Sequence, residues 1–318
     1  MTTVPPAEPG LPPEEVLTPG RRPATAWLPL AAVAFTLLAW ASAFVGIRHL
    51  GETVPPGSLA LGRLVVATVA LGVLLLLQRR RIRVPPRRTW GLLALGGVSW
   101  IGVYNVALNA GEQRVDAGTA ALVVQVGPLI VALLATTLLG ERLTRWLVAG
   151  LAVGFAGVVL IAQASSAGPS GDLVGVLLVL VAALGFAVGV LTQKKLLADL
   201  GALEVTFWFY VAGTVACLPW TLETVDVVGS TSAVDLGWWF YLGLVPSALA
   251  FTTWAYALSS ADAGGFAMLT FLVPFLTALM AWLTLGEVPP PLAFVGGALC
   301  IAGVLLTRRR PRPSTQEG

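Results

Sequence analysis

The chain has 318 residues, of which 57% are apolar and only 11% charged, and its mean hydropathy is +0.86. Soluble domains average about 25% charged residues, so most of this surface must face something other than water. The net charge of +3 does not indicate a nucleic-acid-binding protein, because the arginines gather in short loops between apolar segments.

One histidine, His49, and two separated cysteines, Cys217 and Cys300, offer neither metal-ligand spacing nor a disulfide framework. An enzyme needs a convergent set of acid, base or nucleophile, and the sequence shows none. We therefore expect no cofactor, no metal and no catalysis, and a single polytopic membrane unit instead.

Ten segments are apolar enough and long enough, at roughly 20 residues, to cross a membrane as helices. Breaks rich in Pro and Gly separate them, so the expected fold is an all-α polytopic membrane protein. In chain order the ten predicted spans are 27–47, 59–78, 90–111, 118–140, 145–163, 172–192, 204–220, 236–258, 264–286 and 291–307. Residues 1–26 are rich in Pro and Glu, so we expect a disordered tail there; no cleavable signal peptide is visible.

Lysine and arginine set the predicted orientation, because cytoplasmic loops of membrane proteins carry an excess of both. With both termini in the cytoplasm, 16 of the 19 positive residues fall on the inner side. Arg63 lies within a span. The outer side receives only two arginines, Arg48 and Arg114, and an outer loop carries the acids Glu223, Asp226 and Asp235. We expect a multi-pass protein of the cell (plasma or inner) membrane.

The chain repeats itself at a fixed offset of 146 residues. Aligned without gaps, residues 116–161 and 262–307 agree at 17 of 46 positions. Five spans per half is an odd number, so the second half is predicted to insert upside down relative to the first, as in many secondary transporters. The predicted domains are a first five-helix repeat at 27–163, a second at 164–307 and a basic tail at 308–318.

Several short motifs occur in a defined order along this layout. Trp40-Ala41-Ser42-Ala43-Phe44 lies in the first span, Arg63 in the second, and Leu139-Gly140-Glu141 and Leu285-Gly286-Glu287 end two equivalent spans. In these motifs the chain resembles the drug/metabolite transporter superfamily, and specifically its EamA family of ten-span carriers. The resemblance implies a bundle around a central cavity, with the fifth and tenth helices at the periphery. It also implies transport, often outward, of small metabolites such as amino acids or nucleosides.

Polar side chains inside the predicted spans are the candidate substrate contacts, because a polar group in hydrocarbon is unfavourable without a partner or water. At about 1.5 Å of rise per residue, Arg63, Asn105 and Gln125 lie about 8–10 Å below the outer ends of three different spans. In the second half the polar residues lie toward the cytoplasmic side, so we expect two polar vestibules that meet near the centre. The predicted substrate-binding residues are Trp40, Ser42, Arg63, Tyr104, Asn105, Asn109, Gln125, Tyr210, Thr252, Tyr256 and Thr270.

Arg63 carries the sharpest of these predictions. An arginine fork matches carboxylates and phosphates, so a place in the cavity would favour solutes that bear one of these groups. The alternative is that Arg63 reaches the outer headgroups or forms a structural ion pair with Glu112 or Asp116. The asparagine and glutamine side chains could equally serve as interhelical hydrogen-bond partners.

No Asp or Glu is expected deep inside a span, which leaves Glu112 and Asp116 at the membrane edge as the acids available for ion coupling. The expected function is a secondary transporter, an exporter of small metabolites that works by alternating access. The alternatives are a translocase of lipid or lipid-linked sugar on the same fold, and a membrane-embedded enzyme or scaffold. The expected partners are a small-molecule substrate and membrane lipids, with no nucleic acid and a monomeric protein.

Overall fold

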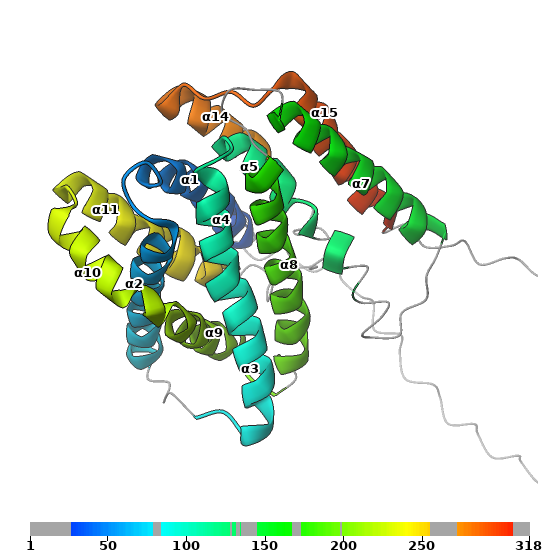
Figure 1. The fold of residues 1–318 in the computed structure, drawn as a ribbon. Coiled ribbons are helices and arrows are strands. Elements are labelled where there is room, and N and C mark those ends of the chain that lie inside the picture. Colours follow the sequence, from blue (N-terminus) through cyan, green and yellow to red (C-terminus); the bar gives the residue numbers. More distant parts are fainter. Residues whose placement is uncertain are drawn as a thin grey trace, which may run out of the picture.

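A computed structural model describes residues 27–78, 84–127, 129–131, 134, 145–166, 173–197, 199–254 and 272–307. The predicted tails at 1–26 and 308–318 lie outside these ranges. The described residues form helices and no strand, which confirms the all-α prediction. In chain order (Figure 1) the elements are α1 (Trp27–Leu50), α2 (Pro56–Leu77), η1 (Arg87–Thr89), α3 (Trp90–Gly96), η2 (Gly97–Val103), α4 (Tyr104–Glu112), α5 (Ala117–Val124), α7 (Arg145–Ser166), α8 (Leu173–Leu196), α9 (Ala202–Cys217), η3 (Leu218–Trp220), α10 (Thr221–Ser230), α11 (Ala233–Leu242), η4 (Gly243–Leu249), α14 (Val273–Leu285) and α15 (Pro291–Thr307).

Six helical stretches within the described ranges are long and apolar enough to cross a membrane. They are Leu30–Leu50, Pro56–Leu77, Arg87–Glu112, Leu173–Leu196, Ala202–Ser230 and Ala233–Trp254. Shorter apolar helices lie at Ala117–Val131, Val148–Ile161, Val273–Leu285 and Pro291–Leu306, where the other four predicted spans fall. The protein is therefore a multi-pass membrane protein, and the count of ten spans stays a prediction.

Exposed apolar stripes on the helices agree with a lipid environment. On α2 the residues Val65, Val69, Val73 and Leu76 are spaced four, four and three apart, which places them on one helix face. Their exposed fractions run from 43% to 63%. A soluble protein rarely exposes such a contiguous apolar surface, so this face of α2 fits hydrocarbon rather than water.

The helix boundaries repeat at the offset of 146 residues. Helices α1 and α8 end at Leu50 and Leu196, and α2 and α9 begin at Pro56 and Ala202. The two π-helices, η2 at Gly97–Val103 and η4 at Gly243–Leu249, occupy equivalent positions in the two halves. The duplication therefore extends in structure well beyond the block where the sequences of the two halves agree.

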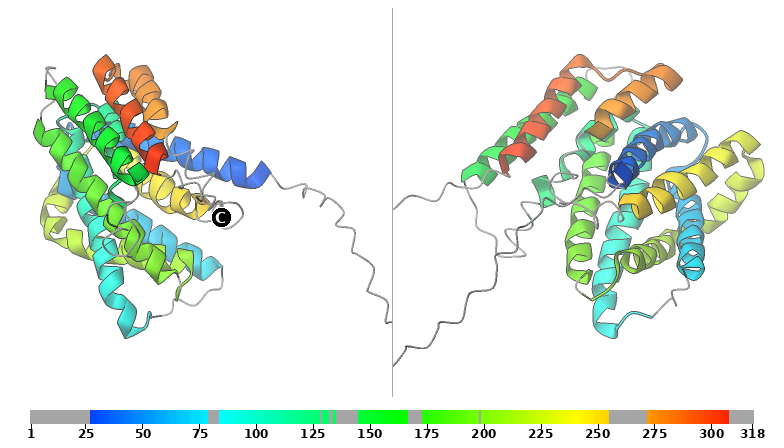
Figure 2. Two further views of the ribbon diagram at one scale, coloured as in Figure 1. Left: turned by 90° about the vertical axis from the view of Figure 1, so that its right-hand side faces the viewer. Right: turned by 180° about the vertical axis from the view of Figure 1, so that it is seen from behind.

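Helices α7 and α15 lie side by side at one edge of the molecule (Figures 1 and 2). Glycines form this contact: a Cβ on Gly157 would lie 2.4 Å from the Gly296 carbonyl oxygen, and one on Gly303 would lie 2.6 Å from that of Gly150. Midway between these contacts the thiol of Cys300 donates to the Gly154 carbonyl oxygen at 3.4 Å. The partner numbers fall as the residue numbers rise, so the two helices run antiparallel.

Helices α2 and α9 meet in the same way. The hydroxyls of Thr68 and Thr214, which are 146 residues apart, are hydrogen-bonded at 2.9 Å. The π-helices pack reciprocally against this pair, because a Cβ on Gly97 would meet Ala212 at 2.6 Å and one on Gly243 would meet Val66 at 2.5 Å. Equivalent residues of the two halves thus contact each other.

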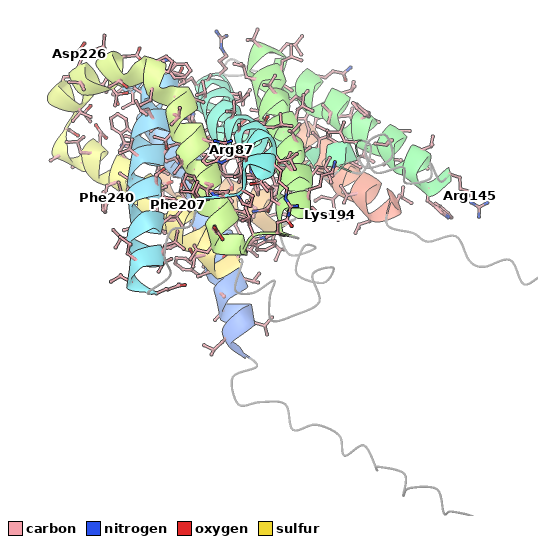
Figure 3. The ribbon with its side chains drawn as sticks, turned by 90° about the horizontal axis from the view of Figure 1, so that it is seen from below. Arg87, Arg145, Lys194, Phe207, Asp226 and Phe240 are labelled. Carbon is pink, nitrogen blue, oxygen red and sulfur yellow. The ribbon has the colours of Figure 1, made fainter. Side chains whose placement is uncertain are left out.

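Polar contacts mark the two ends of the molecule. At the end where α1 stops, Arg48 pairs with Glu287 at 2.7 Å and His49 lies 3.0 Å from Asp235. At the opposite end, seen face-on with Arg87 and Lys194 labelled in Figure 3, Arg88 pairs with Asp199 at 3.1 Å. The first end carries residues predicted to face outward, and the second carries residues predicted to face the cytoplasm.

Two predicted boundaries need correction. Helix α2 begins at Pro56 rather than at residue 59, because proline suits the first turn of a helix, where its missing N–H is not needed. Residues 221–230, predicted as an outer loop, form helix α10, which follows a break at Pro219 in η3. Glu223 in the first turn of α10 accepts a hydrogen bond from Ser58 at 2.7 Å, so this helix is tied to the start of α2.

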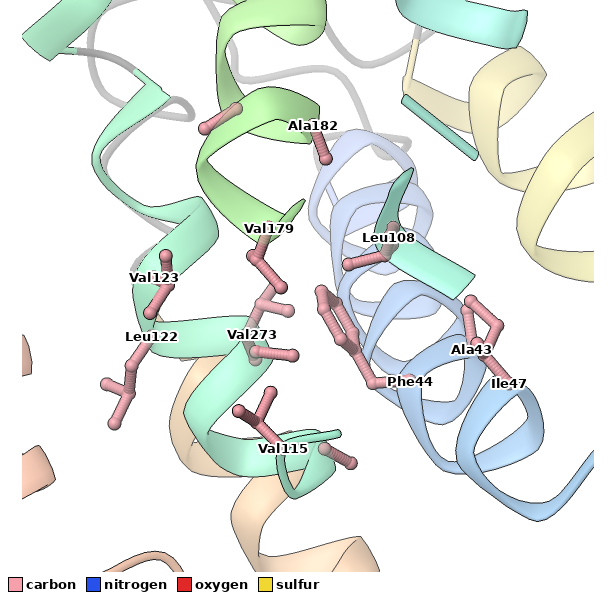
Figure 4. Close-up of a cluster of buried hydrophobic side chains, with 14 of the residues drawn as sticks. Ala43, Phe44, Ile47, Leu108, Val115, Leu122, Val123, Val179, Ala182 and Val273 are labelled. Atoms are coloured by element: carbon pink, nitrogen blue, oxygen red, sulfur yellow. The ribbon is translucent and has the colours of Figure 1, made fainter. Parts of the chain in front are cut away.

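The apolar core joins the two halves. Figure 4 shows Phe44 of α1, Leu108 of α4 and Val179 of α8 together with Val273 of α14, and all four are at most 8% exposed. Helices α1 and α4 belong to the first half of the chain, and α8 and α14 belong to the second. This packing holds the helices that position the polar residues described next.

Candidate functional site

Arg63 lies at the centre of the candidate site, on α2 seven residues or about 10.5 Å of helical rise after Pro56. Its side chain is 7% exposed, and its Nε donates to the Ser247 hydroxyl at 2.9 Å. Ser247 in turn donates to the Leu242 carbonyl oxygen at 2.8 Å, inside the π-helix η4. The Nη1 atom of Arg63 has no hydrogen-bond partner among the described residues.

Three further polar groups surround the guanidinium. Tyr210 of α9, Tyr104 of α4 and Glu112 at the end of α4 all lie within electrostatic range of Arg63. Tyr210 is 2% exposed and lies within electrostatic range of Ser247 as well as of Arg63. Helices from both halves of the chain therefore supply the surroundings of this arginine.

Helix α4 presents a stripe of polar side chains, which we call the α4 stripe: Asn105, Asn109 and Glu112. Their spacing of four and three residues places them on one helix face, and none is more than 4% exposed. Asn105 donates to the Ile101 carbonyl oxygen at 2.7 Å and Asn109 to that of Pro56 at 3.1 Å. The Oδ1 atoms of both amides and both carboxylate oxygens of Glu112 have no partner among the described residues.

An aromatic cluster adjoins this polar region. The ring of Phe251 lies 5.7 Å from Trp40 of α1, 5.6 Å from Trp100 of η2 and 5.8 Å from Tyr210 of α9, measured between centroids. Edge-on contacts of this kind are favourable for aromatic pairs. Tyr210 belongs to both groups, so the aromatic and polar regions are continuous.

The two halves differ at their equivalent positions. Phe209 stands 146 residues after Arg63, and Phe251 stands 146 residues after Asn105. Phe209 is 1% exposed and contacts Trp100 at 6.3 Å between ring centroids. At these two positions the first half has a polar side chain where the second has an aromatic ring, and the site as a whole contains both polar and aromatic groups.

Several predicted site residues make hydrogen bonds that do not involve Arg63. Ser42 is hydrogen-bonded to the Tyr241 hydroxyl at 2.6 Å, and Thr252 donates to the Ala248 carbonyl oxygen of its own helix at 2.7 Å. Gln125 is buried where α5 ends. Tyr256 and Thr270 lie outside the described residues. The structure thus brings together Arg63, Tyr104 and Tyr210, aligns Asn105 with Asn109, and places Trp40 in the adjoining aromatic cluster.

Two expectations about charge change with the structure. Arg63 forms no ion pair with Glu112 or Asp116 among the described residues, and Asp116 instead accepts from the backbone N–H and the hydroxyl of Thr119 at 2.8 and 2.6 Å. Glu112 lies at the end of its helix as expected, but it is fully buried rather than at an exposed membrane edge. A buried carboxylate is therefore present beside the site.

Sequence reasoning did not include Ser247, Phe251 or Glu112 in the site. Glu112 could have been found from its spacing to Asn105 and Asn109, which puts all three on one helix face. Phe251 could have been found as the repeat equivalent of Asn105. Ser247 gives no such signal, because a single serine in an apolar helix is common. Within the described ranges no cluster of three or more His, Cys, Asp or Glu side chains could hold a metal ion.

The pattern of the EamA-like transporter family matches residues 27–163 and 173–309, two copies that cover most of the chain. The chain belongs to this family. It is 39% identical over 279 residues to a "Probable terminal-alkyne amino-acid exporter" of Streptantibioticus cattleyicolor, covering 88% of this chain and 93% of that protein. It is also 30% identical over 277 residues to the "Uncharacterized transporter YdfC" of Bacillus subtilis, covering 84% and 87%.

A solved crystal structure shares the fold of this EamA family member. The two chains superpose with a TM-score of 0.59 at 19% sequence identity, over 88% of this chain and 96% of the other. At that identity the likeness supports the fold and carries no information on the substrate.

Proposed function

We propose that this EamA family member is a secondary transporter that exports small metabolites by alternating access. The observation that carries the proposal is the buried guanidinium of Arg63, whose Nη1 has no hydrogen-bond partner among the described residues although polar groups of α4, α9 and η4 lie near it. Burying a charge without replacing its hydration is strongly unfavourable. A solute that hydrogen-bonds to Arg63 at this place between the two halves would remove that penalty.

The duplication supplies the conformational part of the proposal. Equivalent helices that pack antiparallel, as α7 does with α15, support ten spans in two inverted five-helix repeats. In such a protein each half can adopt the conformation of the other, which opens a central site to either side of the membrane in turn. The excess of arginine in the predicted inner loops supports cytoplasmic termini in a cell membrane.

The amphipathic site favours a small solute with a carboxylate and an apolar part. The carboxylate fits Arg63, because a guanidinium makes strong charge-assisted hydrogen bonds to carboxylates. The apolar part fits the rings around Phe251. Amino acids have both features, and the 39% identical relative is named as an amino-acid exporter.

Counterflow in proteoliposomes tests the function. Purified protein would be reconstituted and exposed to pooled amino acids, nucleosides, organic acids and lipid headgroup analogues, and the accumulated species would be identified by mass spectrometry. The proposal requires saturable accumulation of a carboxylate-bearing solute above empty liposomes. Accumulation of lipid headgroup analogues alone would replace the carrier by a lipid translocase.

Arg63→Ala should reduce counterflow of carboxylate-bearing solutes about tenfold or more, since a hydrogen bond to a charged group contributes about 1.5–3 kcal/mol. Neutral solutes should be affected far less. The melting temperature should not fall, because the change removes a buried charge that lacks a full set of partners. The matched control is Arg88→Ala, which removes an exposed arginine. Equal loss for neutral and anionic solutes would assign Arg63 a structural role.

A further inference from the structure

The α4 stripe presents four buried acceptor oxygens, and each of its two amide nitrogens uses one of its two N–H donors on a backbone carbonyl. Both asparagine Nδ2 atoms face backbone carbonyl oxygens, at Ile101 and Pro56. Since a carbonyl oxygen only accepts, the amide orientation is fixed by chemistry, and Oδ1 is the free atom of each side chain. With the two oxygens of Glu112, four buried acceptor atoms on one helix face have no partner among the described residues.

The charges around Glu112 are otherwise accounted for. Arg48 pairs with Glu287 at 2.7 Å and uses its Nη1 on the backbone oxygen of Glu112 at 2.8 Å. Asp116 is bound to the start of α5 through Thr119. Of the charged groups that face this region, Arg63 and Glu112 are left without an ion-pair partner among the described residues, although they lie in electrostatic range of each other.

We propose that the α4 stripe binds the primary ammonium group of the transported solute, and that Glu112 supplies the opposite charge. This inference rests on the proposed function and specifies its substrate: the solute must carry an amine. A primary ammonium has three N–H donors and no acceptor, so it can bind the Glu112 carboxylate and the Asn109 Oδ1 about one helix turn away. Asn105, a further turn along α4, is left for other polar groups of the solute. A zwitterionic solute would place its carboxylate at Arg63 and its ammonium at Glu112, and would satisfy both unpaired charges at once.

Other ligands fit the α4 stripe less well. A carboxylate or phosphate would face four acceptor oxygens and would be repelled by Glu112. Calcium takes six to eight oxygen ligands and magnesium a regular octahedron, whereas this stripe has one carboxylate and two amides spread over two helix turns. A proton would neutralise Glu112 but would leave the Oδ1 atom of Asn109 without a partner.

Isosteric ligand pairs separate these possibilities by binding. The melting temperature of the full-length protein in detergent would be recorded with leucine and 4-methylpentanoate, and with phenylalanine and 3-phenylpropanoate. The two members of each pair differ only in the amine. If the α4 stripe binds the ammonium group, the amine-bearing members should raise the melting temperature of the wild-type protein. The deaminated members should bind with an affinity at least about tenfold lower. Equal binding within each pair, or no binding of any amine, would overturn the proposal.

Glu112→Gln should remove this preference, lowering the affinity for the amine-bearing members about tenfold or more while the deaminated members bind as before. Glu112→Asp keeps the charge and should keep the preference, so it serves if the glutamine variant fails to fold. Glu52→Gln is the matched control, because Glu52 is an exposed acid in the turn that follows α1. A Glu112→Gln protein that still prefers amines would contradict the proposal.

A transport measurement distinguishes failure of the ammonium site from failure of the proposed carrier function. If amines bind and depend on Glu112 but are not exchanged in counterflow, the binding site stands and the carrier function fails. If Glu112→Gln keeps the amine preference but loses acceleration of transport by a proton gradient, Glu112 carries a proton and the ammonium site is wrong.

Discussion

Among the described residues Arg63 donates one hydrogen bond, from Nε to Ser247, although a guanidinium can donate five. Its side chain is 7% exposed and its Nη1 has no partner within the described structure. Buried charges are favourable only when hydrogen bonds replace their lost hydration. At the scale of the residue, this incomplete set of hydrogen bonds is the reason we propose that Arg63 binds the solute.

Arg48 and Glu287 provide a residue-scale prediction on stability. Their side chains are 19% and 23% exposed, and the pair joins α1 to the segment before α15. Arg48→Glu and Glu287→Arg should each lower the melting temperature in detergent by placing like charges together. The double variant should recover part of the loss, with a coupling energy of about 1 kcal/mol.

The exposed pair Arg88 and Asp199 is the control for this cycle, with side chains 75% and 41% exposed. Because solvent screens such pairs, the same reversals there should show almost no coupling. Equal coupling at both ends would mean that the contact between Arg48 and Glu287 has no special role.

A residue of the candidate site can be predicted from the sequence when it is a polar or charged side chain within an otherwise apolar helix. Arg63, Asn105 and Asn109 meet that condition and lie in the buried polar region. Thr252 was a weaker choice, because threonine can satisfy its hydroxyl on its own helix backbone and does so here. Phe251 looks like any core residue until its repeat equivalent is compared.

At the scale of the elements, close glycine contacts bring equivalent helices together. Glycine permits the backbones of α7 and α15 to approach until a carbonyl oxygen lies where a Cβ would be. Membrane helices use small residues in this way because lipid provides no hydrophobic force between them. The contact is reciprocal, so the two halves should respond alike to the same change.

Gly157→Ala and Gly303→Ala should therefore destabilise the protein by similar amounts, about 1–3 kcal/mol each as expected for overpacking. The added methyl groups would lie 2.4 and 2.6 Å from the facing carbonyl oxygens. Gly237→Ala is the control, since nothing lies within 4 Å of its Cβ position on the exposed face of α11; it should be neutral or stabilising. The measurement is the melting temperature in detergent, and a large difference between the two destabilising variants would contradict the reciprocal packing.

Hydropathy predicts which segments of this chain become apolar helices, because that property depends on composition over about 20 residues. It does not predict η2 and η4, since a π-helix depends on one extra residue in the hydrogen-bond ladder. It also missed α10, where Glu223 and Asp226 in a polar stretch gave the appearance of a loop. The finer features that shape the site were therefore beyond the sequence pattern.

At the scale of the whole molecule, the two halves share a backbone plan but not a chemistry. Helix boundaries and π-helices repeat at 146 residues, while Arg63 and Asn105 correspond to Phe209 and Phe251. A symmetric backbone suits a protein that must open to both sides of a membrane. An asymmetric site suits a solute with a charged end and an apolar end.

Alternating access at Arg63 is tested most directly by a single cysteine beside it. Cys217→Ala and Cys300→Ala remove the native thiols, both of which are buried, and Ser247→Cys places a reporter at the Arg63 side chain. A membrane-impermeant maleimide would be applied to right-side-out and to inside-out vesicles, with and without a transported solute. We predict reaction from both sides, slowed by the solute in each case. Reaction from one side only, unchanged by the solute, would contradict alternating access at this site.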